Sequence, residues 1–281
     1  CDDVIPKGNI NFGIRVLDNI SYVHFKGLNI RNLWSVRTGV ECIGWRFEHS
    51  SNVIIENCTI YNIHGIAFEN WGAYNTYYVN CDAFNCCDSL ALPGITGGRG
   101  TGFSSLNTNL SEPRTGSTYY KGCRAWRCSD QGFSFYNSHY VEVENCWSFC
   151  NGALETGDGH GFKLGFTPGG TSLPIQRKVV NCLAAFNRAT GITTNEGGAY
   201  VSQNMEIYNN TIYHTGFYQG YSWGYGIWID NTTSSDSDEL KRIFKNNIVY
   251  INQSGPVFLG RSSLYNHSNN SWDINMIVSN E

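Results

Sequence analysis

Short stretches in which hydrophobic and polar residues alternate recur along the whole chain. One of them has eight recognisable copies, and the shortest distance between equivalent positions is the 23 residues from Thr59 to Asp82. Alternation with a period of two predicts strands with one face in a core, and a repeat of this length predicts a solenoid. The copies are VHFKGLNIRN, VIIENCTIYN, YYVNCDAFN, YYKGCRAWR, VEVENCWSFC, KVVNCLAAFN, MEIYNNTIYH and IFKNNIVYIN.

A second alternating element lies between these copies and begins with glycine. Each repeat therefore has two or three short strands separated by single turn residues, and no segment has amphipathic helical spacing. This pattern predicts an all-β protein, a right-handed parallel β-helix. The second element is found as GVECIG, GIAFEN, GFSSLN, GFSFYN, GFKLGF, GITTNE, GIWIDN and GPVFLG, which start at Gly39, Gly65, Gly102, Gly132, Gly161, Gly191, Gly226 and Gly255.

Three long insertions interrupt the repeat, at residues 90–119, 152–176 and 213–241. Gly, Ser and Thr dominate them, so we expect loops that leave the solenoid rather than separate domains. No domain boundary is visible. We therefore expect residues 1–281 to form a single parallel β-helix domain with long loop insertions.

The glycine-led strands predict a continuous surface. Every second side chain of a strand points outward, and neighbouring coils lie about 4.8 Å apart, so equivalent outward residues form columns. Such an elongated face of polar and aromatic groups suits a polymeric carbohydrate. The first predicted column is Glu41, Ala67, Ser104, Ser134, Lys163, Thr193 and Trp228. The second is Ile43, Glu69, Leu106, Tyr136, Gly165, Asn195 and Asp230.

Composition excludes several classes of protein. The 281 residues are 41% hydrophobic and 15% charged, with a formal net charge of −4. These values argue against a disordered chain and against a basic nucleic-acid-binding protein, and no apolar run approaches the roughly 18 residues of a membrane span. We expect a monomer that binds neither nucleic acid nor the membrane interior.

The cysteines also fit the repeat. Five of the eleven follow Asn or Gly and precede a short strand, which indicates small buried core residues rather than disulfides. No cysteine spacing matches a structural zinc site. A leading Cys1 fits either a lipoprotein start or an arbitrary boundary, and we expect a secreted or cell-surface protein whose signal peptide is not part of this chain. The five repeat cysteines are Cys58, Cys81, Cys123, Cys146 and Cys182.

Lys163 is the only basic residue in either column, and it lies in the segment GDGHGFKLG at residues 157–165. Four glycines in these nine residues let backbone or ligand atoms approach closely. An isolated lysine on a sheet is usually only a solvated side chain. Here the preceding coil supplies a carboxylate, an amide and two hydroxyls, which favours a functional role. These residues are Asp130, Gln131, Ser134 and Tyr136.

The sequence resembles the pectate lyase family 9 of parallel β-helix polysaccharide lyases. The resemblance runs from about Asn57 to Asp273 and is most specific at GFKLG, where the family has its catalytic lysine. It implies that Lys163 is the base, that the partner is an acidic and usually pectic polysaccharide cleaved by β-elimination, and that Ca²⁺ is the cofactor. It also implies that part of the family's N-terminal cap and C-terminal coils is missing here. Other matching segments are GCRAWRCSDQGFSFYNS, ENCWSFCNG, NCLAAFNRATGIT, EIYNNTIYH and NNSWD.

This chemistry makes two demands. Removing the C5 proton of a uronate requires neutralisation of the adjacent carboxylate and a base whose pKa lies near the working pH. A lysine generally meets the second demand only when positive charge or desolvation lowers its pKa from about 10.4. A calcium ion with six to eight oxygen ligands would satisfy both demands.

The chain departs from the family at the calcium acids. The family has Asp-Gly-Phe and Asp-Asp-Gly-x-Asp, whereas this chain has TGF at 101–103 and DQGFS at 130–134, so Asp130 alone remains. Asp88 and Asp158 could replace the missing metal ligands. Otherwise uncharged and basic side chains would neutralise the substrate carboxylate, and the candidates are Gln131, His160, Arg127 and Arg188.

Further substrate-binding roles follow from residue type. His160 stands where the family motif has Asn, and it either donates to the substrate carboxylate or has no role. Tyr136 either protonates the leaving oxygen or stacks on a sugar ring. Ser134, Asn195 and Trp228 complete the predicted binding residues along the same face.

Two other classes of function remain open. A glycoside hydrolase needs two carboxylates about 5 to 10 Å apart, which Asp130 and Asp158 could supply. A non-catalytic glycan-binding β-helix would explain the loss of calcium acids. Among lyases, a calcium-independent enzyme for alginate or another uronate polymer is the alternative to a pectic enzyme.

Overall fold

The computed structural model of the chain describes most of the repeat. Cys1 lies outside the described residues, and the three insertions lie partly outside them, so the expectation of a lipoprotein start stays a prediction. The described residues are 10–18, 20–35, 38, 41–90, 97–106, 117–136, 140–152, 154, 157–165, 175–194, 203–216, 224–229, 242–252, 254–259 and 265–272.

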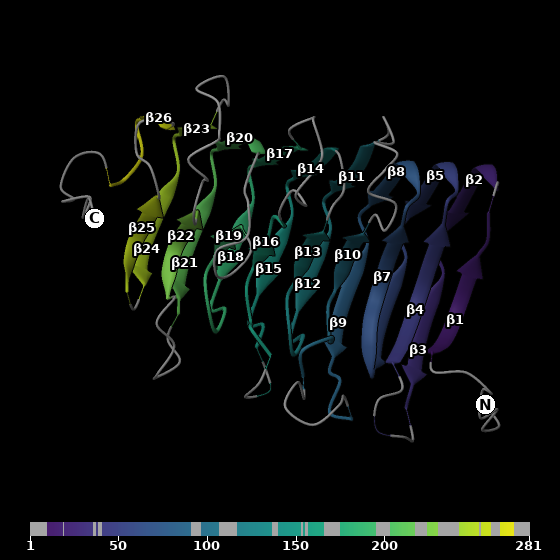
Figure 1. The fold of residues 1–281 in the computed structure, drawn as a ribbon. Coiled ribbons are helices and arrows are strands. Elements are labelled where there is room, and N and C mark those ends of the chain that lie inside the picture. Colours follow the sequence, from purple (N-terminus) through teal and green to yellow (C-terminus); the bar gives the residue numbers. More distant parts are fainter. Residues whose placement is uncertain are drawn as a thin grey trace.

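Every described element is a strand, and the strands form three parallel sheets that run the length of the molecule (Figure 1). Sheet A contains β1 (Ile10–Val16), β4 (Glu41–Glu48), β7 (Gly65–Trp71), β10 (Phe103–Leu106), β13 (Phe133–Tyr136), β16 (Phe162–Lys163), β19 (Ile192–Thr193), β22 (Tyr225–Ile229) and β25 (Gly255–Leu259). Sheet B contains β2 (Ser21–Lys26), β5 (Ser51–Glu56), β8 (Tyr74–Val79), β11 (Ser117–Lys121), β14 (Tyr140–Glu144), β17 (Ile175–Val180), β20 (Gln203–Tyr208), β23 (Arg242–Lys245) and β26 (Tyr265–Ser268). Sheet C contains β3 (Asn29–Leu33), β6 (Thr59–Ile63), β9 (Asp82–Cys86), β12 (Arg124–Trp126), β15 (Trp147–Phe149), β18 (Leu183–Ala185), β21 (Thr211–Thr215) and β24 (Ile248–Asn252).

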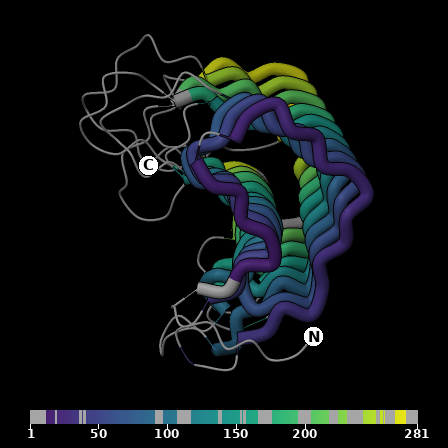
Figure 2. The backbone as a smooth tube through the Cα atoms, turned by 90° about the vertical axis from the view of Figure 1, so that its right-hand side faces the viewer, coloured from purple at the N-terminus to yellow at the C-terminus, as the bar shows by residue number. Residues whose placement is uncertain are grey.

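Each coil contributes one strand to each sheet in the order A, B, C, except that the last described coil contributes only β25 and β26. The coils superimpose when viewed along the axis (Figure 2), and each strand pairs in parallel with the equivalent strand one coil away. The predicted all-β parallel β-helix is therefore confirmed. Among the described residues, no helix is long and apolar enough to cross a membrane.

An internal stack of aromatic rings supports sheet A. Phe68, Phe103, Phe133 and Phe162 occupy equivalent inward positions, and successive ring centroids are 4.9, 4.8 and 4.9 Å apart. Offset stacking contributes about 0.5–1.5 kcal/mol per pair beyond simple burial. Because Phe162 is locked in this stack, the next residue, Lys163, must point away from the core.

The corner between sheets B and C explains five of the cysteines and many asparagines. The five repeat cysteines are buried there, and their thiols donate to backbone carbonyls of the preceding coil, as Cys123 does to the Tyr78 carbonyl at 3.4 Å. These five cysteines are free and buried, which confirms their interpretation as core residues. In the last coils Asn210 and Asn247 take over the same inward position, with the Asn247 carboxamide oxygen accepting from Asn210 Nδ2 at 3.0 Å.

Candidate active site on sheet A

The register of sheet A shows which side chains share a column with Lys163. Lys163 pairs with Ser134 on one side and Thr193 on the other, and Ser134 pairs with Ser104. Ser104 in turn pairs with Glu69 rather than with Ala67. The observed column is Arg15, Arg46, Glu69, Ser104, Ser134, Lys163, Thr193 and Trp228.

The first predicted column was therefore right from Ser104 to Trp228 and wrong before Ser104, whereas Asn195 and Asp230 of the second column lie outside the described residues. The register makes Ala67, and not Gly65, the residue equivalent to Gly102, because Phe103 pairs with Phe68. Gly65 lies two residues earlier and pairs with Cys42. This shift places Glu69, instead of Ala67, in the Lys163 column, and Ala67 is fully buried. Ile43 is also fully buried, so it is not part of the second column, where Trp71, Leu106 and Tyr136 pair instead.

The open part of the column is short. Ser104, Ser134 and Lys163 are half-buried, whereas Thr193 is buried and the Trp228 side chain is only 6% exposed. Trp228 thus lies in the predicted column without offering an exposed stacking surface. Asn195 lies outside the described residues, so its predicted role in binding stays a prediction.

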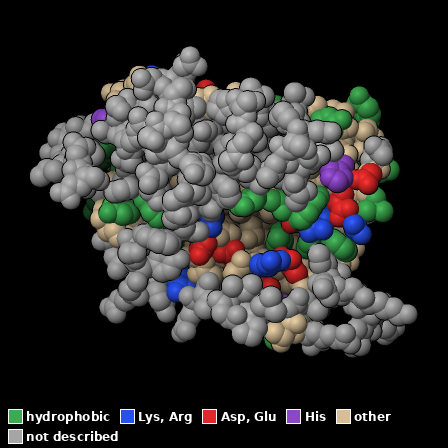
Figure 3. Space-filling model, in the orientation of Figure 1, with side chains coloured by type: hydrophobic (Ala, Val, Ile, Leu, Met, Phe, Trp, Pro, Cys, Tyr) green, Lys and Arg blue, Asp and Glu red, His purple; other side chains and the backbone are tan. Residues whose placement is uncertain are grey.

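Lys163 is held in a polar network at the edge where the strands of sheet A begin. Its Nζ lies 2.9 Å from Oδ2 of Asp158, and Gln131 Nε2 donates to the same oxygen at 2.9 Å. Thr101 Oγ1 donates to the other side of the Gln131 carboxamide, at 3.2 Å from Oε1. The side chains of Lys163 and Asp158 are 13% and 28% exposed, so the pair is largely shielded but still reachable from solvent. On this face, charged side chains form a band along the axis (Figure 3).

The predicted calcium ligands do not fit a calcium site in the described residues. Asp158 Oδ2 already accepts from an ammonium and an amide, and Asp130 Oδ1 accepts from the Asp158 backbone N–H at 3.2 Å. Asp88 is buried one coil earlier, where its backbone N–H meets Ser129 Oγ at 3.3 Å. No group of three or more His, Cys, Asp or Glu among the described residues could hold a metal ion. We therefore derive no step through calcium.

Two predicted substrate-binding side chains face the protein instead of the surface. His160 is fully buried, and its Nδ1 accepts from the Thr190 backbone N–H at 3.2 Å. Arg188 is 5% exposed and donates to the backbone carbonyls of Leu154 and Gly157. Arg188 thus fastens the segment that precedes Asp158, which is a positioning role.

The two remaining predicted side chains are exposed. Arg127 lies on the turn after β12 with a φ of 53°. Burial raises the pKa values of the nearby Cys87 and Cys150 thiols, and the charge of Arg127 offsets only part of this rise. It therefore belongs to the corner between sheets C and A. Tyr136 is 40% exposed at the end of β13, two residues after Ser134.

Sequence reasoning missed three residues near this site. Thr101 orients Gln131, and Arg99, exposed two residues earlier, forms an ion pair with Glu41 at 2.8 Å. The third is Arg46, which is bonded to Glu69 and lies with its guanidinium carbon 4.4 Å from the centre of the Trp71 ring. The available signal for Arg46 was the segment GWRF at 44–47, which has the same phase as GFKL at 161–164.

The three parallel sheets make the chain a β-helix protein, and its candidate site is the polar network around Lys163 on sheet A. A family profile described as "Pel9A-like, right handed beta helix region" matches residues 3–230. The chain belongs to the Pel9A-like right-handed β-helix family.

Individual relatives agree with this assignment. Pectate lyase L of Dickeya chrysanthemi is 28% identical over 267 residues, which cover 92% of this chain and 53% of that protein. The chain thus spans about half the length of the curated relatives it matches. A solved rhamnogalacturonan lyase has a TM-score of 0.69 at 24% identity, with 92% of this chain and 65% of that chain covered. Pectate lyase Pel9A has a TM-score of 0.58 at 19% identity, with 93% and 71% covered.

Proposed function

We propose that this chain is a polysaccharide lyase that cleaves a uronate-containing, pectic polysaccharide by β-elimination, with Lys163 as the base. The observation that carries the proposal is the position of Lys163, half-buried at the C-terminal end of the open column and held by Asp158, which Gln131 also contacts. Family membership and relatives named pectate lyase support the substrate class.

In this mechanism the amine of Lys163, after its own proton has passed to solvent, takes the C5 proton of the uronate that lies over the column. The electron pair of the C5–H bond forms the C4–C5 double bond, the bond from C4 to the bridging oxygen breaks, and that oxygen takes a proton. Asp158 fixes the position of Nζ, which a near-attack geometry requires. Tyr136, exposed beside the column, is the candidate donor to the leaving oxygen.

The negative charge that develops on the sugar carboxylate must be stabilised. Ser104 and Ser134 offer hydroxyl donors in the column itself. Arg99 is an exposed cation at the same edge of sheet A. It precedes β10 in the same way as Asp158 precedes β16. We assign these three residues to carboxylate binding, in place of Arg127 and Arg188.

The same proposal places the chain outside the cell, because an intact polysaccharide does not cross a membrane. That the chain is a monomer stays a prediction. The hydrolase alternative is weaker on geometry. Asp130 is 5% exposed and its Oδ1 is occupied by the Asp158 backbone N–H, so it is poorly placed to serve as an acid or nucleophile.

The test is the ultraviolet absorbance of unsaturated uronate released from polygalacturonate, rhamnogalacturonan, alginate and glucuronan. Lys163→Met should lower the rate by roughly 100- to 10,000-fold, the usual contribution of a general base. Lys178→Met is the matched control, because Lys178 also pairs with a carboxylate, Glu142 Oε1 at 3.0 Å, but lies on sheet B. It should leave the rate unchanged.

Three results would overturn the proposal. A Lys163→Met variant that keeps its activity would exclude the lysine as base. A folded wild-type protein that releases reducing sugar without the unsaturated product would be a hydrolase, and one that releases nothing from any polymer would be a binding protein.

A further inference from the structure

A row of left-handed turn residues marks the corner between sheets B and C on the outside of the molecule. Asparagine holds most of these positions with φ near 50°, and glycine interrupts the row at Gly122 with a φ of 65°. The neighbours of Gly122 in the row are Asn80 and Asn145, one coil away on either side. The loss of one side chain leaves a notch between two carboxamides that lie about 10 Å apart, two coil steps.

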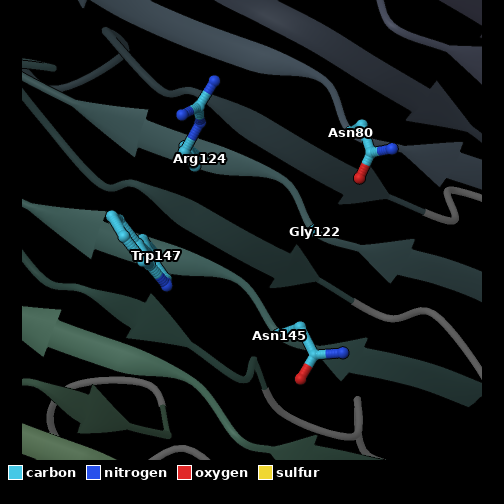
Figure 4. Close-up of a pocket in the computed structure, with 5 residues that line it drawn as sticks. All are labelled: Asn80, Gly122, Arg124, Asn145 and Trp147. Atoms are coloured by element: carbon cyan, nitrogen blue, oxygen red, sulfur yellow. The ribbon is translucent and has the colours of Figure 1, made fainter.

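This notch is a pocket with a volume of about 480 Å³. Figure 4 shows Asn80 and Asn145 on either side of Gly122, with Arg124 and Trp147 across from them. Arg124 and Trp147 come from the first positions of β12 and β15, which pair with each other and point outward from sheet C. The pocket therefore opens on sheets B and C, whereas Lys163 points outward from sheet A.

Trp147 has an open ring surface. The outer face of sheet C also carries a row of aromatic rings, but Phe84 and Trp126 cover each other with centroids 4.5 Å apart, and Phe149 continues the stack at 5.5 Å. Trp147 is 48% exposed and has no ring partner among the described residues. An exposed indole beside hydrogen-bonding groups is suited to the apolar face of a sugar ring.

The polar groups of the pocket are balanced in charge. Arg124 donates through Nε and Nη2 to both oxygens of Asp82, at 2.7 and 2.6 Å, which fixes the guanidinium plane and leaves the Nη1 donors available. The nearby Lys121 is paired with Glu144 at 3.3 Å. Because the pocket has two carboxamides and an arginine whose charge is neutralised by Asp82, it should bind hydroxyl groups rather than a carboxylate.

We infer that the Gly122 notch is a second, non-catalytic site that binds one pyranose ring of a polysaccharide chain, with the ring stacked on Trp147 and its hydroxyls bonded by Asn80, Asn145 and Arg124. The inference rests on the proposed function, because the bound ring belongs to the same polymer that is cleaved at sheet A. Its role is to keep a long chain on the protein while sheet A acts on it.

Two variants test the site from opposite directions. Trp147→Ala removes the stacking surface. Gly122→Asn fills the notch with the residue that the row uses elsewhere, since Asn tolerates this φ. The added Cβ would overlap the Asn80 carboxamide oxygen, so the flexible Asn80 side chain must also move out of the notch. Tyr250→Ala is the matched control, because Tyr250 is an exposed aromatic residue of sheet C, 59% exposed and remote from the notch.

Binding is measured by retardation in native gels cast with polygalacturonate, rhamnogalacturonan or neutral galactan. Trp147→Ala and Gly122→Asn should each weaken binding to at least one polymer by roughly tenfold, as expected for loss of one aromatic contact. Tyr250→Ala should bind like wild type. All three variants should release unsaturated uronate from a short oligosaccharide at the wild-type rate.

The outcomes separate this site from the proposed active site. If no polymer yields the unsaturated product but retardation still depends on Trp147, the proposed function fails and the second site stands. If Lys163-dependent cleavage is found and retardation is absent, or is the same in Trp147→Ala and Gly122→Asn as in wild type, the second site is refuted and the proposed function stands.

Discussion

Glu69 provides a test of whether burial or charge pairing dominates in the column that holds Lys163. Its side chain is 3% exposed, it is bonded to Arg46 Nε, and it lies next to Ser104 in the register of sheet A. Burial raises the pKa of Glu69 to about 7, because the loss of hydration outweighs the attraction of Arg46. The perturbation is Glu69→Gln, which keeps the shape and removes the titration.

The magnitude follows from the difference between the folded and unfolded pKa values. An unfolded glutamate has an ordinary value of 4.5, so between pH 4.5 and about 7 the unfolded chain loses a proton that the folded chain retains. The free energy of unfolding of the wild type should therefore fall with rising pH across this window, by about 3 kcal/mol in total, relative to Glu69→Gln. Above pH 7 both states are ionised and the difference should be constant.

The assay is urea unfolding of the wild type and of each variant at several pH values from about 3 to 8.5, because the effect of Glu48 lies below its ordinary pKa. Glu48→Gln is a control of opposite sign on the neighbouring strand. Burial raises the pKa of Glu48, but the hydrogen bond and charge of Arg15, helped by Arg46, outweigh burial and lower it below its ordinary value. Stability from Glu48 should therefore be present above the ordinary pKa and be lost as the pH falls through the lowered value.

A wild-type curve that stays parallel to that of Glu69→Gln from pH 4.5 to 8.5 would refute the reasoning. It would mean that Glu69 is ionised throughout and that Arg46 and the ring of Trp71 compensate fully for its burial. The size of the offset between the two curves does not enter this test, because the glutamine also changes the hydrogen bond to Arg46; only the change of the offset with pH does.

Two further predictions concern the candidate active site. A chelator should leave the rate of cleavage unchanged, because Asp158 and Asp130 already accept from protein donors; loss of activity in chelator with recovery on added calcium would contradict this. Arg177→Met should lower kcat by roughly 10- to 100-fold with little change in KM, because Arg177 Nε donates to the Leu164 carbonyl at 2.7 Å and anchors the two-residue strand that bears Lys163. Unchanged kcat in a folded Arg177→Met protein would show that the other bonds of the strand suffice.

The sequence predicted the fold because the β-helix is a one-dimensional repeat. Alternation identifies strands, and equivalent residues stack from coil to coil, so a phase that is right in one coil carries over to the next. The phase was right from Ser104 onward, where the strands β10, β13, β16 and β19 each start directly after a glycine in the corner. That corner position needs a small residue, since a Cβ on Gly102 would lie 2.8 Å from the Cβ of Ala125. Ala67 meets the same need, so the glycine two residues earlier gave a false phase.

The turns could not be predicted in the same way. Alternation says nothing about a segment with several glycines, and the direction of a side chain there depends on contacts between coils. His160 and Arg188 were expected to face substrate, yet the chain folds tightly around Arg188, with Gly152 and Gly159 against its side chain. Their burial follows from this close packing, which the glycines permit but do not reveal.

The observed column also suggests how much of a polymer the site can engage. Toward the N-terminal end it closes at Glu69, which is buried with Arg46, and toward the C-terminal end it closes at Thr193 and Trp228. The open stretch from Ser104 to Lys163 covers two coil steps, about 10 Å. A stretch of this length holds only a short segment of chain, so the affinity of sheet A for a long polymer should be modest. A second contact on sheets B and C would then matter more for long substrates than for short ones, which is the dependence on Trp147 that the gel and oligosaccharide measurements compare.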